Sequence, residues 1–262
     1  MKKAVLLSML ILLCFSAWAE QAWINPTAGG ILEAYKELPP SALMKFDITL
    51  SNSKRESIAG SLLSDRLEKS DLTDSKMANA LTVTVDTNRR SPITVNIWFS
   101  PFISTAETGN KKVSVTWKKE SSSSTTIDHD TATDEETGKP YDRFFSVDGV
   151  CYRYSLSIAT KNKSGSSVTS VTASTTAGAS INLIFTPTAQ KNTRSDGAWT
   201  GSWTNVTTIP ATESGVLPGI TEDSEASVHA TATFSMTLGT AFSELIANTR
   251  YTSTVRITIQ GD

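Results

Sequence analysis

Two histidines, His129 and His229, are the side chains best suited to transfer protons near neutral pH, and neither belongs to a recognisable catalytic motif. A hydrolase would need one of them beside an activated serine, but the Gly-x-Ser-x-Gly turn that presents such a serine does not occur. The sequence also lacks a glycine-rich phosphate loop and a His-x-x-x-His zinc pair. We therefore expect a protein that is not an enzyme and has no cofactor. A secreted hydrolase is kept as an alternative of another class.

Three aspartates, Asp128, Asp130 and Asp134, belong to the densest group of candidate metal ligands. Calcium and similar hard cations bind several carboxylate oxygens that converge on one point, and closely spaced acids in a loop can supply them. The spacing matches neither an EF-hand nor a glycine-rich and aspartate-rich calcium repeat. Acidic runs are more often solvated loops. The three aspartates are thus a candidate cation site, with a solvated loop as the alternative.

Two tryptophans, Trp199 and Trp203, are the candidate ligand-binding aromatics. They share the parity of a strand, so one sheet face could carry both side chains. Aromatic rings on such a face can stack against the apolar face of a sugar. The commoner role of a tryptophan in a β-sandwich is to anchor the core between the sheets. The pair therefore predicts either a glycan-binding surface or part of the core.

The elements that would position these tryptophans belong to a stretch that occurs twice, at residues 94–117 and 180–203. The copies are identical at four positions, at a constant offset of 86 residues: Asn96, Phe99, Pro101 and Trp117 match Asn182, Phe185, Pro187 and Trp203. Each copy has the pattern of an alternating strand stopped by proline, a polar loop, and a returning strand that ends on tryptophan. We therefore predict a β-hairpin that is used twice.

Alternation of apolar and polar side chains recurs along most of the chain. In the clearest case Phe46, Ile48 and Leu50 share one face, while Asp47 and Thr49 lie on the other. Further strands are expected at residues 81–85, 151–158, 168–173, 180–185, 198–203, 227–238 and 251–259. Threonine and serine fill the alternate positions, which is typical of half-exposed antiparallel strands. The pattern predicts an all-β, antiparallel, immunoglobulin-like β-sandwich.

Two segments depart from this pattern. In residues 53–67, Ser53 and Glu56 form a capping-box pattern before leucines at helical spacing, so we expect a short helix or an irregular hairpin tip. Residues 119–140 are rich in serine, threonine and acids, which favours a linker or a long exposed loop. We place a domain boundary there, between β-sandwich domains at residues 41–118 and 141–262, with one large sandwich as the alternative.

The first 19 residues have the organisation of a secretory signal peptide. Lys2 and Lys3 precede an apolar run that ends in Ala17-Trp18-Ala19, and this run is shorter than the ~20 residues of a membrane-spanning helix. We expect cleavage near Ala19 and an extracytoplasmic location, in the periplasm, at the cell surface or secreted. The mature chain is expected to have no transmembrane span and to begin with an irregular N-terminal arm at residues 20–40.

The net charge of the chain limits the classes of partner that it can bind. Removal of Lys2 and Lys3 takes two positive charges from the formal net charge of −2 and leaves −4. Because there is no basic stripe to neutralise phosphates, we exclude nucleic acid as a partner.

Cys14 would leave with the signal peptide, so that Cys151 is the only cysteine of the mature chain. Its neighbours predict a buried strand residue that acts as a small hydrophobe.

The end of the chain combines a small turn with an alternating strand. Asn248-Thr249-Arg250-Tyr251 precedes a run that alternates threonine or arginine with valine or isoleucine, from Thr254 to Ile259. This stretch resembles the closing strand of secreted bacterial β-sandwich modules of the pilin and spore-coat-U type. The resemblance implies an extracellular structural or adhesive role without catalytic residues. We therefore expect a non-enzymatic structural or adhesive protein whose partners are other protein subunits or surface glycans. The alternative is a glycan-binding module that uses Trp199 and Trp203.

Overall fold

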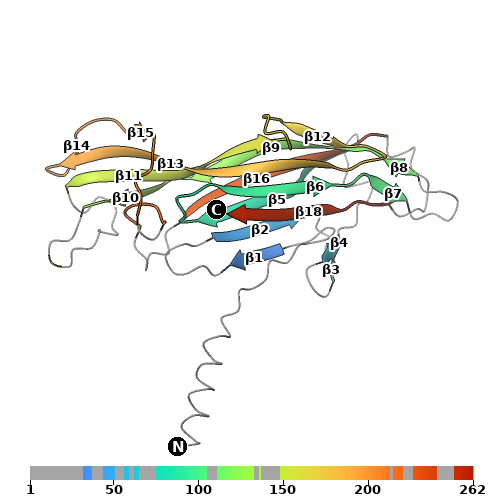
Figure 1. The fold of residues 1–262 in the computed structure, drawn as a ribbon, viewed down its shortest axis with the longest axis horizontal. Coiled ribbons are helices and arrows are strands. Elements are labelled where there is room, and N and C mark those ends of the chain that lie inside the picture. The colour runs from blue at the N-terminus through green and yellow to red at the C-terminus, as the bar shows by residue number, and fades with distance from the viewer. Residues whose placement is uncertain are drawn as a thin grey trace, which may run out of the picture.

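A computed structural model of the chain shows two β-sheets packed face to face (Figure 1). It describes residues 32–36, 44–50, 56–58, 62–64, 75–104, 111–132, 136, 148–212, 215–220, 227–240 and 251–261, the first four ranges as backbone only. The predicted signal peptide lies outside the described residues. Every regular element among the described residues is a strand, and none of them forms a helix with the length and apolar character needed to cross a bilayer.

The first sheet has six strands in the order β1-β2-β5-β16-β9-β12, and each neighbouring pair is antiparallel. The bounds are β1 (Leu32–Lys36), β2 (Met44–Leu50), β5 (Lys76–Thr87), β16 (Val228–Leu238), β9 (Val115–Thr125) and β12 (Ser170–Ala173). Strand β2 covers the alternating run around Phe46 that the sequence predicts. Strand β1 lies within the predicted irregular arm, so residues 32–36 of that arm are regular structure.

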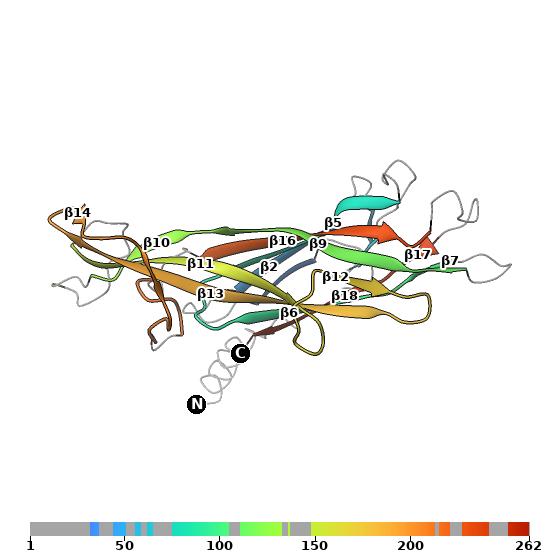
Figure 2. The same ribbon diagram turned by 90° about the horizontal axis from the view of Figure 1, so that it is seen from above.

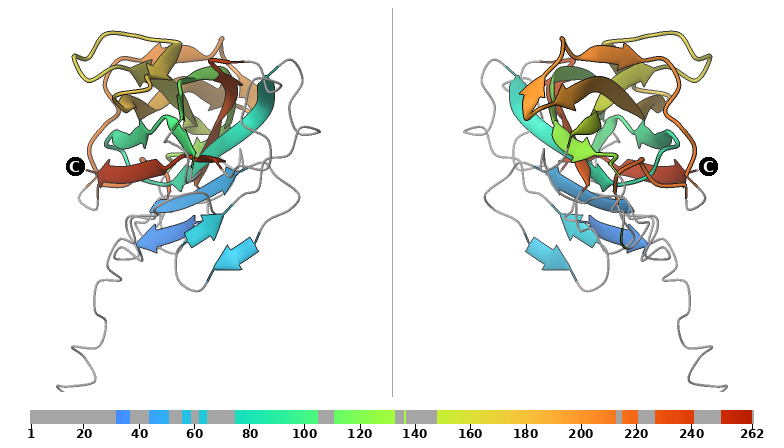
Figure 3. Two further views of the ribbon diagram at one scale, coloured as in Figure 1. Left: turned by 90° about the vertical axis from the view of Figure 1, so that its right-hand side faces the viewer. Right: turned by 90° about the vertical axis from the view of Figure 1, so that its left-hand side faces the viewer.

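The second sheet has the order β10-β11-β13-β6-β18, with two short strands, β14 and β15, paired to β13. The bounds are β10 (Ile127–Asp130), β11 (Gly149–Lys161), β13 (Ala179–Ser195), β6 (Ile93–Phe99), β18 (Val255–Gly261), β14 (Ala198–Trp199) and β15 (Thr204–Val206). A small sheet joins β17 (Tyr251–Thr252), β7 (Phe102–Ser104) and β8 (Lys112–Val113). Figure 2 shows these strands running along an elongated body, and Figure 3 shows the layers from its two ends.

One apolar cluster fills the space between the sheets. Phe99 of β6 stacks on Trp117 of β9 with ring centroids 4.6 Å apart, and Phe234 of β16 lies 6.4 Å from Phe99. Large aromatic side chains contribute most of the buried area of such cores, so this group holds the second sheet against the first. Trp117 is 3% exposed and anchors the core between the two sheets. The all-β, antiparallel sandwich is thereby confirmed.

The strands on either side of the predicted boundary at residues 119–140 are interleaved. Strand β16 lies between β5 and β9 in the first sheet, and β6 lies between β13 and β18 in the second. Residues 119–130 are also mostly strand, because β9 and β10 extend through the serine-rich segment. The prediction of a linker or a long exposed loop is therefore wrong for these residues. The described strands do not separate into the two predicted ranges, since backbone hydrogen bonds join them across the boundary.

The helix predicted within residues 53–67 is also corrected. The described part of this segment is an antiparallel hairpin of β3 (Glu56–Ile58) and β4 (Leu62–Ser64), in which Ser57 lies opposite Leu63. Helical spacing of a few leucines is a weak signal when strand pairing supplies an alternative set of backbone hydrogen bonds. The hairpin interpretation is the one that the structure supports.

The predicted twofold hairpin is wrong in both copies, because β6 and β9 of the first copy lie in different sheets and the second copy has no strand end at its proline. Strand β6 ends before Pro101, as expected, but β13 continues through Pro187. The two copies pair with each other, and Asn96 Nδ2 donates to Asn182 Oδ1 at 2.7 Å. Along the same side of β13, pairing with β6 ends at Phe185 and pairing with β15 begins at Ala189. Pro187 falls in the gap, where a strand tolerates a residue without an N–H.

Candidate functional site

A groove of about 890 Å³ runs over the second sheet beside β15. We call it the arginine groove. Its lining residues are Arg90, Ser91, Pro92, Thr126, Arg153, Ser155, Thr186, Pro187, Thr188, Ala189, Gln190, Asn205, Val206, Thr207, Thr208 and Ile209. Most of these side chains carry a hydroxyl, an amide or a guanidinium group, and none carries a carboxylate. The groove therefore offers cationic and neutral hydrogen-bonding groups to a ligand.

Strand alternation directs the polar side chains into the arginine groove. Tyr154 and Leu156 of β11 face the core, so Arg153 and Ser155 face outward. The Ser155 hydroxyl bonds to that of Thr188 across the β11–β13 pair at 2.9 Å. Such cross-strand pairs hold the side chains in a fixed arrangement.

A second contact joins β13 to β15. Gln190 Nε2 donates to Asn205 Oδ1 at 3.0 Å, and the two residues lie opposite each other in the strand register. This bond holds β15 and the residues after it as one wall of the groove.

Arg153 links the groove to the two candidate tryptophans. Its guanidinium carbon lies 3.9 Å from the centroid of the Trp203 ring, and its Nε lies 3.0 Å from Asp128 Oδ1. The Nε and Oδ1 atoms have no hydrogen-bond partner, so their contact is an ion pair with bent geometry. An arginine held between a carboxylate and an indole face has a defined orientation. Nothing in the sequence singled out Arg153 except its place in an alternating strand.

Trp199 and Trp203 are in contact, although not for the reason that the sequence suggested. Strand β14 ends at Trp199, so the two side chains are not neighbours on one strand face. Their ring centroids are 5.1 Å apart and their planes are tilted by 54°. Arg153 covers the Trp203 ring, whereas Trp199 is 40% exposed. The exposed aromatic surface of the pair therefore belongs mainly to Trp199.

The candidate cation ligands are only partly within the described residues. Asp128 and Asp130 lie in β10, and Asp134 lies outside the described part. Asp128 pairs with Arg153, while Asp130 is fully buried and its Oδ1 accepts a hydrogen bond from the Ala132 amide at 2.8 Å. The described residues contain no group of three acidic, histidine or cysteine side chains arranged to hold a metal ion. The three-aspartate site stays a prediction.

The two histidines and the cysteine lie in strands. His129 of β10 is buried, with its ring centroid 6.0 Å from that of Tyr154. His229 of β16 lies opposite Asp86 of β5, and its Nε2 is 3.4 Å from Thr231 Oγ1. Cys151 is fully buried in β11, as predicted.

The chain matches no protein-family model, and no curated protein is similar to it in sequence.

Proposed function

We propose that this protein is an exported, non-enzymatic structural or adhesive β-sandwich that associates with other protein subunits through a strand edge. The observation that carries the proposal is the position of β18 at the end of the second sheet. Among the described residues β18 pairs only with β6, so one of its edges has no strand beside it. An edge strand presents a row of backbone donors and acceptors that a strand of another chain can pair with.

The backbone groups on that edge can be assigned from the pairing. Ser100 N donates to Thr254 O at 2.9 Å, and these two residues continue the register of β6 and β18. In an antiparallel pair the residues that bond to the partner alternate with residues that point away. Val255, Ile257 and Ile259 therefore direct their N–H groups to the open edge. Val255 and Ile257 also bury their side chains, which fixes the strand in place.

The test is sedimentation velocity over a range of concentrations, with Ile259→Pro as the variant and Ile259→Val as the matched control. Proline removes an N–H from the open edge without breaking the pairing to β6, whereas valine keeps it. We expect the wild type and Ile259→Val to associate as concentration rises, and Ile259→Pro to associate at least tenfold less tightly. A monomeric wild type at every concentration would contradict the proposal.

A second candidate function, glycan binding, is supported by the aromatic pair beside the arginine groove. Trp199 offers exposed ring surface, and Arg153 extends from Trp203 into a groove rich in hydroxyl and amide groups. Sugar binding commonly combines stacking on an aromatic ring with hydrogen bonds to polar side chains.

The corresponding test is quenching of tryptophan emission by soluble polysaccharides. Trp199→Ala should abolish the response. Trp98→Ala is the control, because Trp98 also lies beneath an arginine, Arg256, at 5.1 Å, but does not line the groove. An unchanged response in Trp199→Ala, or no response to any glycan on an array, would remove this candidate.

A further inference from the structure

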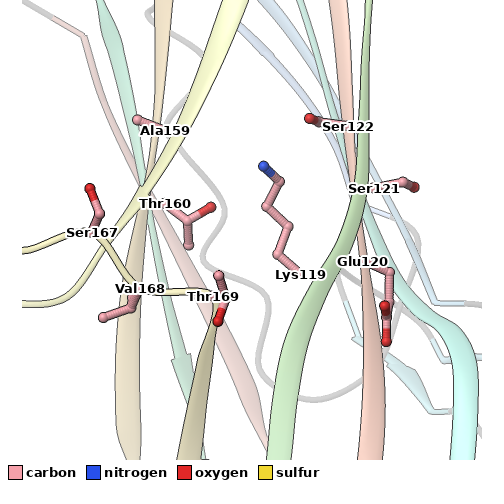
Figure 4. Close-up of a pocket in the computed structure, with 9 residues that line it drawn as sticks. All are labelled: Lys119, Glu120, Ser121, Ser122, Ala159, Thr160, Ser167, Val168 and Thr169. Carbon is pink, nitrogen blue, oxygen red and sulfur yellow. The ribbon is translucent and has the colours of Figure 1, made fainter.

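A second cavity, of about 280 Å³, lies where β9 of the first sheet and β11 of the second sheet diverge. We call it the β9–β11 cleft. Figure 4 shows the side chains that line it. The loop at residues 167–169 closes one end, because Lys119 N donates to Thr169 O at 2.9 Å and Val168 N donates to Thr160 O at 3.0 Å. The cleft is therefore a defined part of the fold.

A β-bulge turns a lysine into this cleft. Lys119 lies opposite Phe234 of β16, and Ser121 lies opposite Thr233, so Glu120 is the extra residue. Partners across a strand pair share a face, and Phe234 is buried between the sheets. Lys119 consequently points inward, where Trp117 also points. Bulges are a common means of re-aiming a side chain.

Two hydroxyl groups lie on the same side. Ser122 is opposite the buried Ala232, and Thr160 is opposite the buried Leu183. Thr160 is 8% exposed, and its buried Oγ1 has no hydrogen-bond partner. In Figure 4 the Thr160 hydroxyl and the Lys119 amino group are directed toward each other across the cleft. A buried hydroxyl without a partner is uncommon and costs free energy, so this one is best explained by a group that occupies the cleft.

The neighbouring acid does not neutralise Lys119. Glu120 points to the outer face, where its carboxylate accepts hydrogen bonds from Ser235, Lys76 and Lys118 at 2.6, 2.9 and 3.2 Å. Among the described residues, the Lys119 ammonium has no ion-pair partner. The Ser122 hydroxyl has no hydrogen-bond partner among them either. The inner face of the cleft thus carries one uncompensated positive charge beside two hydroxyl groups.

We propose that the β9–β11 cleft binds a carboxylate, with Lys119 as the charged partner and Thr160 and Ser122 as hydroxyl donors. An ammonium group only donates hydrogen bonds, and an ionised carboxylate only accepts them, so the two are complementary. The volume lies just below the roughly 300–1,000 Å³ of ligand pockets, which limits the ligand to the size of one sugar or one amino acid. The inference depends on neither β18 nor the arginine groove.

The carboxylate could come from an acidic sugar or from an acidic amino acid, and two probes separate these sources. Glucuronate and N-acetylaspartate are titrated into the purified full chain by isothermal calorimetry, with glucose as the neutral match of glucuronate. We expect saturable binding of at least one of the two acids and none of glucose. The acid that binds more tightly identifies the source.

Variants assign the binding to the cleft. Lys119→Met keeps the length of the side chain without its charge and should weaken binding by about tenfold or more, as expected for loss of a charge-assisted hydrogen bond. Thr160→Val keeps the shape and should weaken it severalfold. Lys118→Met is the matched control, because Lys118 is the preceding residue and lies outside the cleft, and it should bind as the wild type does.

Circular dichroism of each variant establishes whether it is folded. If Lys119→Met does not fold, Thr160→Val alone tests whether the acid binds in the cleft. No saturable binding of either acid, equal binding of glucose, or an unchanged affinity in both cleft variants would overturn the proposal.

Discussion

Replacing Tyr154 by phenylalanine should destabilise the protein by about 2 kcal/mol, because it deletes one partner of a buried hydrogen bond. The fully buried Tyr154 donates its hydroxyl proton to the carbonyl oxygen of Pro218. Pro218 belongs to a segment that packs Leu217 and Ile220 into the core. The substitution leaves the carbonyl without this donor at the wall of the core, and such losses cost about 1–3 kcal/mol.

Urea unfolding followed by circular dichroism measures this change. We expect a lower midpoint with an unchanged slope, and a Tm lower by roughly 4–8 °C for a chain of this size. Tyr152→Phe is the matched control. Its ring stacks on Tyr154 at 5.9 Å, and its hydroxyl has no hydrogen-bond partner among the described residues. If Tyr154→Phe is as stable as the wild type while Tyr152→Phe is less stable, the assignment of this hydrogen bond is refuted.

The same hydroxyl predicts a dependence on alkaline pH. Burial, with a smaller contribution from Tyr152, raises the pKa of Tyr154 well above its usual value of about 10. Above the usual pKa of tyrosine, the unfolded chain loses the hydroxyl proton of Tyr154, whereas the folded chain keeps it. The stabilisation is therefore complete below about pH 10 and decreases as the pH rises further. Tyr154→Phe should remove this part of the loss of stability at alkaline pH.

Three further predictions concern the core and two titrating groups. Phe99→Ala removes the ring stacked on Trp117 and should cost about 3–5 kcal/mol, measured by urea unfolding; a loss below about 1 kcal/mol would contradict the packing. Hydrogen bonds from Ser235, then from Lys76 and Lys118, lower the pKa of Glu120 to about 2. The ionised carboxylate therefore contributes to stability above the usual pKa of glutamate, and this contribution is lost as the pH falls through about 2. Carbon NMR of the carboxyl group should show that midpoint, and a midpoint near 4.5 would exclude these bonds. Burial, reinforced by Asp130, raises the pKa of the Cys151 thiol to about 11, so a thiol reagent at pH 8 should label the unfolded protein and leave the native protein unlabelled.

The apolar alternation predicted the strands well where it was strong. Phe46, Ile48 and Leu50 identified β2, and the run of valine and isoleucine near the end of the chain identified β18. Strand β9 was missed beyond Lys119, because Ser121 and its neighbours have no apolar face of their own and become a strand by pairing with β16. The prediction that a strand ends at Pro187 was wrong for a related reason. Pro187 is tolerated within β13 only because the neighbouring strands leave a gap there.

The candidate sites show the same limit. The sequence indicated that Trp199 and Trp203 belong together, but it did not indicate that Arg153 packs on Trp203, because that contact joins residues distant in the chain. The β9–β11 cleft was not predicted either. The inward orientation of Lys119 depends on the bulge at Glu120, and a bulge is set by the register between two strands rather than by the residues of one.

The interleaving of early and late strands has a consequence for how the chain is made. The hydroxyl contact between Thr84 and Thr231 joins residues 147 positions apart, and that between Ser100 and Ser253 spans 153 positions. Proteins whose contacts are this distant in sequence fold slowly, typically in milliseconds to seconds. A nascent chain that has not yet reached β16 has β5 and β9 with no strand between them, and without β18 one edge of β6 stays unpaired. Synthesis must therefore pass β16 before the first sheet can close and β18 before the second can, and a chaperone that binds extended segments has that interval in which to act.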